Sequence, residues 1–282
     1  MGKSIHLLTE RERLLLGRAQ AKVYASVDGG KDLSIHFYFP RDLSDDASRP
    51  VFLFFNGGAW DRGSVVQFAP HALHFVERGA VCGLVEYRNR ASHPGVSPED
   101  ALTDGRAAIR FVREHSDRLH VDPSRLVAFG ASAGGNLAGN AANADEPSRP
   151  NAVVMYSPII DIEKGAYGYD AFVDNAEARK ASLSRHIVAG MPPMLIIHGT
   201  ADRLVPIKGV QEFSKRVGKK KNSCDFVEFE GRDQNFFNLN YDPASYEIAL
   251  STTAEFLDRH RILVKSEDDE DTQVISWRER DY

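Results

Sequence analysis

A serine between glycines, in the stretch GASAGG at residues 130–135, is the residue best placed to do covalent chemistry. Ser132 follows a strongly apolar run and precedes small residues from Asn136 to Ala142. In the G-x-S-x-G pattern a strand turns sharply into a helix, which lifts the serine hydroxyl above the sheet. The helix N-terminus adds positive potential there. The sequence therefore predicts a serine nucleophile, and a glycine-rich turn with an incidental serine is the less favoured alternative.

A second glycine segment, NGGAW at residues 56–60, directly follows the apolar run VFLFF. Backbone N–H groups of Gly57 and Gly58 can point into a site there. Together with the N–H of Ala133, they could hold the oxyanion of a tetrahedral intermediate. A Gly-Gly loop without a catalytic role is the alternative, which the serine motif makes less favourable.

Asp202 closes a third apolar stretch, in the sequence HGTAD at residues 198–202. A carboxylate at the carboxyl end of a strand can orient a histidine beside a serine nucleophile. It can equally cap its own loop. From the residues alone, both interpretations of Asp202 stay open.

Apolar runs and helix-like stretches alternate along the chain, and these elements must position the three motifs. We expect strands at 22–27, 33–39, 51–55, 80–86, 125–130, 152–156, 194–198 and 224–229, and helices at 67–78, from 98 onward and at 245–260. This alternation predicts an α/β fold, a mostly parallel twisted sheet with helices on both faces. Between residues 157 and 190 the pattern lapses, which indicates a small lid insertion over the carboxyl edge of the sheet, where such folds bind ligands.

These motifs together resemble the α/β-hydrolase superfamily, and within it the hormone-sensitive-lipase-like and acetylxylan-esterase-like carboxylesterases. The resemblance covers roughly Val51 to Phe256. FFNGGAWDRGS resembles the family's oxyanion segment, usually H-G-G-G-W, with Asn56 where histidine is common. GASAGG matches the serine turn, and MPPMLIIHGTADRLVP matches the acid segment. The resemblance implies an α/β-hydrolase fold with a small lid and assigns Asp202 as the acid of a catalytic triad.

The histidine of that triad is missing from its expected place. The family pattern after the last strand is close to E-G-x-G-H-G-F-F-N, whereas this chain reads EGRDQNFFN over residues 230–238. Gln234 occupies the histidine position. Asp233 and Asn235 replace both neighbouring glycines, which favours natural divergence over a single deliberate change. An amide cannot accept the proton of a serine hydroxyl, so the predicted catalytic set is Ser132, Asp202 and Gln234 with its base lost.

Four other side chains are candidates for a substitute base. His198 lies four residues before Asp202, at the end of its strand. His186 and His93 fall in irregular segments near the predicted carboxyl edge. Asp233 is a carboxylate in the histidine's own segment, and its low reference pKa makes it a weak base.

Two functions from different classes remain. The first is a carboxylic-ester hydrolase that acts on short acyl esters, such as acetylated sugars, through Ser132 with impaired activity. The second is a non-catalytic pseudo-hydrolase that binds a small ligand or a protein partner in the former ester pocket. The residues at 230–238 decide between these two functions.

The composition sets the remaining boundaries. The 282 residues are 42% hydrophobic and 27% charged, which is ordinary for a globular protein. Of the net charge of −5, residues 265–282 contribute −4, since they hold seven acids and three bases. We therefore expect one hydrolase domain over residues 1–264, with its lid at about 157–190, and an acidic tail over 265–282. The near-neutral body argues against a nucleic-acid partner.

Several kinds of site and location are not indicated by the sequence. No metal is expected, because histidines and carboxylates lack paired ligand spacing, and no cofactor is expected, because no phosphate-binding glycine loop occurs. No apolar run is long enough for a membrane span. The N-terminus lacks a signal-peptide core, so we expect a cytoplasmic protein, although a removed secretory leader would leave the same sequence. Cys82 and Cys224 are expected to be core thiols, and no pattern encodes an oligomeric state.

Overall fold

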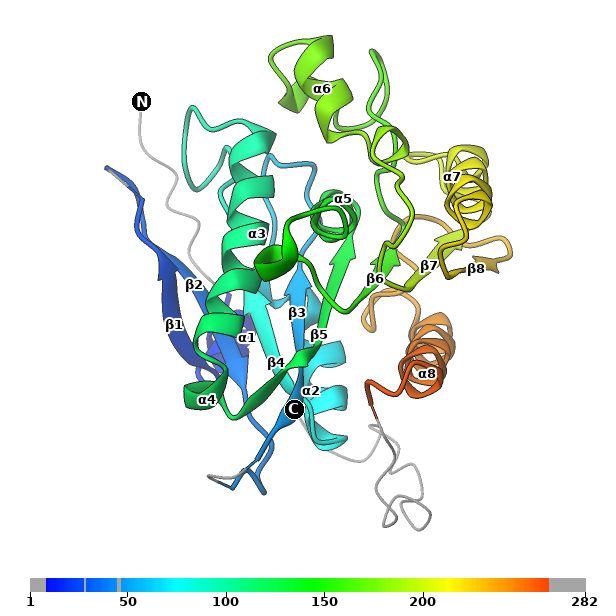
Figure 1. Cartoon of the computed structure of the whole chain (residues 1–282). Coiled ribbons are helices and arrows are strands. Elements are labelled where there is room, and N and C mark those ends of the chain that lie inside the picture. Colours follow the sequence, from blue (N-terminus) through cyan, green and yellow to red (C-terminus); the bar gives the residue numbers. More distant parts are fainter. Residues whose placement is uncertain (1–8, 28, 45–46, 264–282) are drawn as a thin grey trace.

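One central sheet organises the molecule, a computed structural model that describes residues 9–27, 29–44 and 47–263 (Figure 1). Its strands in this part of the chain are β1 (Gln20–Ala25), β2 (Leu33–Tyr38), β3 (Arg49–Phe55), β4 (Val81–Val85), β5 (Val121–Ala131), β6 (Ala152–Tyr156), β7 (Met194–Gly199) and β8 (Cys224–Phe229). They lie in the order β1-β2-β4-β3-β5-β6-β7-β8. β2 pairs antiparallel with both β1 and β4, and the other neighbours pair in parallel. The predicted α/β class is thus confirmed. The predicted acidic tail lies outside the described residues.

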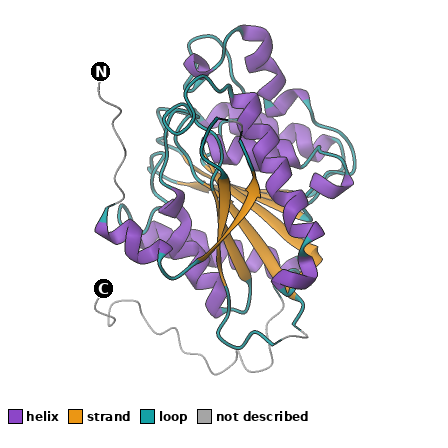
Figure 2. Cartoon of the chain, turned by 90° about the vertical axis from the view of Figure 1, so that its left-hand side faces the viewer, coloured by secondary structure: helices purple, strands orange, loops and turns teal. Residues whose placement is uncertain are grey.

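Helices cover both faces of the sheet (Figure 2). They are α1 (Glu10–Leu16), α2 (Ala69–Glu77), α3 (Pro98–Glu114), α4 (Ser116–Leu119), α5 (Ala133–Ala141), α6 (Asn175–Ala181), α7 (Ile207–Lys219) and α8 (Pro243–Arg259), with short 3₁₀ turns η1 (Val65–Phe68), η2 (Glu146–Ser148), η3 (Tyr169–Ala171) and η4 (Leu183–Arg185). One core contains apolar residues of α3, α5 and α7, and a second contains those of α2 and α8. No helix of the described ranges is both long and apolar enough to cross a membrane.

Strand register brings the three predicted motifs to one edge. Phe55, the last residue of β3, pairs with Val85 of β4 and with Gly130 of β5. Farther across the sheet, Ala131 pairs with Tyr156. The strands run in parallel, so the glycine segment after β3 and the serine after β5 leave the sheet on the same side. Residues 51–55 are all buried, as the apolar run predicts for a strand covered on both faces.

Helices α2, α5 and α8 begin at positions different from those predicted. The stretch predicted as one helix over 67–78 begins as the 3₁₀ turn η1, and α2 starts only at Ala69 with Pro70 in its first turn. Helix α5 starts directly after Ser132, so Ala133, Gly134 and Gly135 of the motif form its first turn, and α8 starts at Pro243. Helix α3 begins at Pro98, as predicted, and Ser97 and Asp100 form a capping box at its start.

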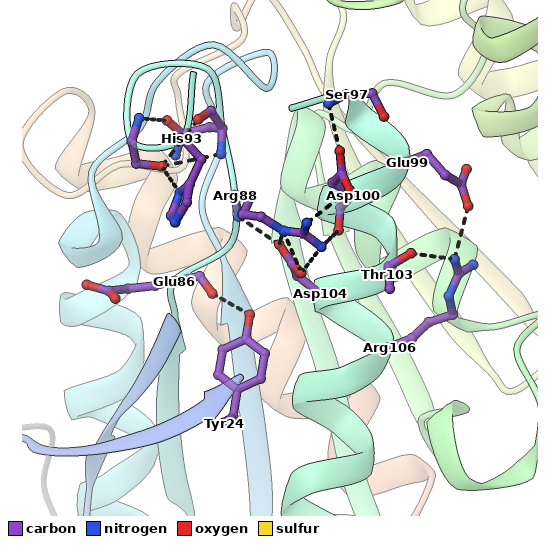
Figure 3. Close-up of polar contacts among 12 residues, drawn as sticks. Tyr24, Glu86, Arg88, His93, Ser97, Glu99, Asp100, Thr103, Asp104 and Arg106 are labelled. Atoms are coloured by element: carbon purple, nitrogen blue, oxygen red, sulfur yellow. Dashed lines mark hydrogen bonds and ion pairs between the residues drawn. The ribbon is translucent and has the colours of Figure 1, made fainter. Parts of the chain in front are cut away.

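An arginine ties the loop after β4 to α3 (Figure 3). The Arg88 guanidinium donates to both carboxylate oxygens of Asp104, with a shortest distance of 2.7 Å, and to Asp100 Oδ1 at 2.9 Å. The backbone N–H of Arg88 also donates to Asp104. The loop continues to Arg90 and Ala91, whose N–H groups donate to carbonyls of the glycine segment at residues 60 and 61. This ion pair therefore anchors a loop that in turn braces the candidate site.

The two cysteines differ in environment. Cys82 is fully buried in β4, as predicted for a core thiol. Cys224 is only partly buried, since it begins the edge strand β8, and its Sγ lies 3.5 Å from Ser214 Oγ. The prediction of a core thiol is confirmed for Cys82, whereas Cys224 is a partly buried thiol that packs against the edge of the core.

A histidine is buried on α2 without any polar partner. His71 is 1% exposed and packs edge-on against Phe68, Tyr156 and Tyr246, at centroid distances between 4.8 and 5.5 Å. Neither ring nitrogen has a hydrogen-bond partner among the described residues. Burial lowers the pKa of His71 from 6.5 to about 3, so the folded protein holds this imidazole neutral.

We expect this side chain to make the fold sensitive to acid. The folded pKa lies below the unfolded value, so the contribution of His71 is complete above about pH 6.5 and is lost as the pH falls toward 3. By pH 4.5 the loss from this group is about 2–3 kcal/mol. Urea unfolding at pH 7 and pH 4.5 measures it, and His71→Phe should lose less free energy of unfolding than the wild type. Equal losses in the two proteins would contradict this account.

Candidate active site

Ser132 lies at a strained turn between β5 and α5. Its backbone has φ 53° and ψ −117°, a conformation that non-glycine residues adopt only when the surroundings enforce it. A Cβ on Gly130 would lie 2.0 Å from the carbonyl oxygen of Gly134, and one on Gly134 would lie 2.1 Å from that of Phe55. Both positions therefore require glycine, which explains the two glycines of the G-x-S-x-G pattern.

The backbone of Ser132 is fixed while its hydroxyl is not engaged. Its N–H donates to the Tyr156 carbonyl at 3.1 Å, and its carbonyl accepts the N–H groups of Asn136 and Ile159. The residue is 8% exposed. Within the described ranges the Oγ atom has no hydrogen-bond partner. The backbone thus places the hydroxyl of Ser132, but no described residue is in position to activate it as a base would.

The glycine loop, residues 56–60, lies directly against this serine. A Cβ built on Gly57 would be 3.3 Å from Ser132 Cβ. The next residues have positive φ: 135° at Gly58, 50° at Ala59 and 58° at Trp60. The N–H of Gly57 donates to Gln67 Oε1 at 2.8 Å. Gly57 is thus engaged in this structure, whereas the N–H groups of Gly58, Ala59 and Ala133 have no acceptor in the part of the chain that is described.

Asp202 presents one free carboxylate oxygen in a buried position. Its Oδ1 accepts the N–H groups of Leu204 and Val205, each at 2.9 Å, which fixes the carboxylate plane. Its Oδ2 is buried without a hydrogen bond to any described residue. Burial raises the pKa of Asp202. The His198 Nε2 atom lies 3.4 Å from this oxygen. An oriented carboxylate of this kind is what the acid of a triad offers to an imidazole N–H.

Gln234 lies at the same edge but does not pair with Asp202. The N–H of Ala201 donates to the Arg232 carbonyl at 2.9 Å, which joins the segment 230–238 to the loop of Asp202. Gln234 is 7% exposed, and its Nε2 donates to the Ser157 carbonyl at 3.1 Å. Its Oε1, like Ser157 Oγ, is buried without a partner among the described residues. The structure therefore places Gln234 inward, with its amide turned to the strand end of β6.

The four candidate substitute bases are engaged elsewhere. His198 is fully buried, with Nε2 at 2.8 Å from the Val205 carbonyl and 3.4 Å from Asp202 Oδ2, and burial lowers its pKa. His93 bonds through Nδ1 to Ser92 and through Nε2 to the Lys31 carbonyl.

The other two candidates, His186 and Asp233, form hydrogen bonds with residues close to them in the chain. His186 bonds to the Lys180 carbonyl at 2.6 Å. Asp233 accepts the N–H of Asn235 and the hydroxyl of Tyr241. None of the four makes a hydrogen bond to Ser132 within the described ranges. Nor does this part of the chain bring together three or more His, Cys, Asp or Glu side chains that could hold a metal ion.

The segment 157–190 packs against the glycine loop, a contact that the sequence did not predict residue by residue. The Trp60 ring meets that of Phe172 edge-on at 5.2 Å. Arg90 donates to the Asp170 carbonyl at 3.1 Å. The contact of Gly57 with Gln67 was likewise missed, because no local pattern marks a side chain ten residues downstream as the partner of a backbone N–H.

Comparisons with known proteins point to the same kind of protein as the sequence motifs, a carboxylesterase with the α/β-hydrolase fold. The BD-FAE family model matches residues 35–217. Esterase LipC of Mycobacterium tuberculosis is 28% identical over 233 residues, which are 71% of this chain and 57% of LipC. Carboxylesterase NlhH of the same species is 36% identical over 111 residues, 39% of this chain and 33% of NlhH. The chain thus spans between a third and little more than half of the length of these two relatives.

Among solved structures, a thermophilic esterase of Thermogutta terrifontis has a TM-score of 0.81 at 33% identity, covering 89% of this chain and 96% of its own. That esterase has also been solved with propionate and with butyrate bound. The resemblance inferred from the motifs is confirmed. The sheet order, the serine turn and the family match agree: the chain belongs to the BD-FAE family and has the α/β-hydrolase fold.

Proposed function

We propose that this protein is a slow carboxylic-ester hydrolase that acts on short acyl esters through Ser132. The observation that carries the proposal is the free hydroxyl of Ser132, held in a strained backbone beside the glycine loop. The N–H groups of Gly58 and Ala133 are the oxyanion donors in this proposal, with that of Ala59 beside them. Gly57 would join them only after its bond to Gln67 is broken.

Short acyl groups are the favoured substrates because a structural relative binds short-chain acids. The esterase of Thermogutta terrifontis binds propionate and butyrate in its solved structures, and it shares 33% identity over nearly its whole length. Acetyl to butyryl esters are therefore the first substrates to test.

The missing histidine sets the expected speed. Without a base, the attack of the serine on an ester is expected to be about 10²–10⁴-fold slower, which is the usual contribution of general-base catalysis. Hydrolysis of the acyl-enzyme needs the same base to activate water. The proposal thus implies that Ser132 acylates slowly with an activated ester and that the acyl group is then retained.

The second candidate function, a non-catalytic binder, is favoured by one observation. Gln234 is bonded to the Ser157 carbonyl rather than to Asp202, and within the described ranges no imidazole contacts Ser132. A ligand or partner segment that carries a short acyl chain would then occupy the former ester pocket without being cleaved.

Acylation by p-nitrophenyl acetate separates these two functions. We expect intact-mass spectrometry to show one added acetyl group on the wild type, mapped to Ser132, together with a release of nitrophenol close to one equivalent. Ser132→Ala should show neither. If the wild type gains no acetyl group while still binding butyrate in calorimetry, the binder is correct and the hydrolase is not.

A further inference from the structure

Gln67, on the 3₁₀ turn η1, bridges two segments of the candidate site. Its Oε1 accepts the N–H of Gly57 at 2.8 Å, and its Nε2 donates to Asn238 Oδ1 at 3.2 Å. Since the N–H of Gly57 can only donate, the oxygen of the Gln67 amide must face the glycine loop. This fixes the orientation of the amide. Asn238 in turn donates to the Asn235 carbonyl at 2.9 Å, next to Gln234.

The glycine loop needs such a restraint. Ala59 and Trp60 both have positive φ, a conformation that costs about 1–3 kcal/mol for each such residue. Strain of this kind persists only when neighbouring groups hold it. Other restraints come from the backbone: the Asp61 and Arg62 N–H groups both donate to the Gly58 carbonyl. The side chain of Gln67 adds a further restraint, because it connects the glycine loop to Asn238 in the segment 230–238.

The position of Gly57 makes this restraint relevant to chemistry. Gly57 lies against Ser132 Cβ, and it directly precedes the free N–H groups of Gly58 and Ala59. A shift of about 1 Å in groups that meet a transition state can cost about 100-fold in rate. Oxyanion donors act only where charge develops, so their displacement should lower turnover more than substrate binding.

We propose that Gln67 is a positioning residue that locks the glycine loop to the segment 230–238 and so sets the oxyanion donors against Ser132. It touches no reacting atom in this role. The inference rests on the proposed function, since it concerns the same serine and the same donors. It adds that the loss of the histidine at 234 has left the link between the two segments intact.

Gln67→Met tests the lock, because methionine has a similar length and cannot accept or donate here. Gln67 and Asn238 both line a hollow of about 200 Å³, which leaves room for the altered side chain. We expect the rate constant for covalent labelling of Ser132 by a fluorophosphonate to fall by about 10–100-fold. In a Gln234→His background, kcat for p-nitrophenyl acetate should fall by the same factor while KM changes less than about threefold.

Two further variants separate positioning from general damage. Ser64→Ala removes a hydrogen bond to Glu12 in the wall of the same hollow, without touching Gly57, and should leave the labelling rate unchanged. Asn238→Leu should slow labelling, and adding it to Gln67→Met should cost little more, because the two act as one link. Urea midpoints are recorded for all variants.

Each outcome has a distinct meaning. If neither the wild type nor Gln234→His labels at Ser132, the proposed function fails and the inference falls with it. If the parents label and Gln67→Met labels equally fast, only the inference is wrong. It is also wrong if Gln67→Met changes KM alone, or if its loss of rate is matched by Ser64→Ala.

Discussion

Replacing Gln234 with histidine is expected to raise kcat for p-nitrophenyl acetate by about 10²–10⁴, the usual contribution of a positioned general base. That gain corresponds to about 3–5 kcal/mol of barrier. The position is already buried at the carboxyl edge, in a segment joined to the loop of Asp202. Steady-state kinetics of the wild type and Gln234→His, side by side, measure the gain.

The expectation depends on the state of Asp202. Two backbone N–H groups fix its Oδ1, while Oδ2 is buried, has no hydrogen bond among the described residues and lies 3.4 Å from His198 Nε2. An imidazole at 234 that donates its Nδ1–H to this oxygen would leave Nε2 to face the serine. Adding Asp202→Asn should then remove most of the gain, because the wrong tautomer costs about 10⁴ in a serine protease.

The matched control is Asn235→His. It places the same imidazole one residue away, at an exposed position of the same segment. It should leave kcat at the wild-type level. If both histidine variants gain equally, the rate comes from nonspecific imidazole chemistry. If neither gains, the serine and its oxyanion donors are not aligned for catalysis, and the non-catalytic binder becomes the better description.

The sequence predicted the fold and the serine turn because both depend on local patterns. A run such as VFLFF predicts a strand that is buried on both faces. At residues 130 and 134 the neighbouring backbone leaves no space for a side chain, so glycine is required there. Register between parallel strands then brings the motifs to one edge without further information. The assignment of Gln234 to the histidine position rests on flanking residues that match the family pattern, and it stays a prediction.

The remaining features depend on contacts that are far apart in the sequence. Gln67 and Asn238 are separated by 171 positions, and nothing near either residue indicates the other. The engagement of Gly57, predicted as an oxyanion donor, comes from its own hydrogen bond to Gln67. The direction of the Gln234 amide, toward Ser157 and not toward Asp202, could also be found only in three dimensions.

Replacing Arg88 with methionine is expected to lower the free energy of unfolding by about 3–5 kcal/mol, because it leaves a buried carboxylate without its partner. Asp104 is 3% exposed and accepts three guanidinium hydrogen bonds and a backbone N–H from Arg88 (Figure 3). For a chain of this size, each kcal/mol corresponds to about 2–4 °C in Tm. Urea and thermal unfolding followed by circular dichroism measure both quantities.

Arg106→Met is the control, since its contact with Glu99 is an ion pair with an exposed acid on the same helix and should be worth less than about 1 kcal/mol. Arg88→Met combined with Asp104→Leu should recover part of the loss, because no buried charge is then left unpaired. A loss that the second substitution does not reduce would contradict this explanation.

The Arg88 loop also donates two N–H groups to the end of the glycine loop, at the carbonyl of Trp60 and at that of the next residue, Asp61. In the Gln234→His background, Arg88→Met should therefore lower kcat even at temperatures where the protein stays folded, which would connect the stability of α3 to the geometry beside Ser132.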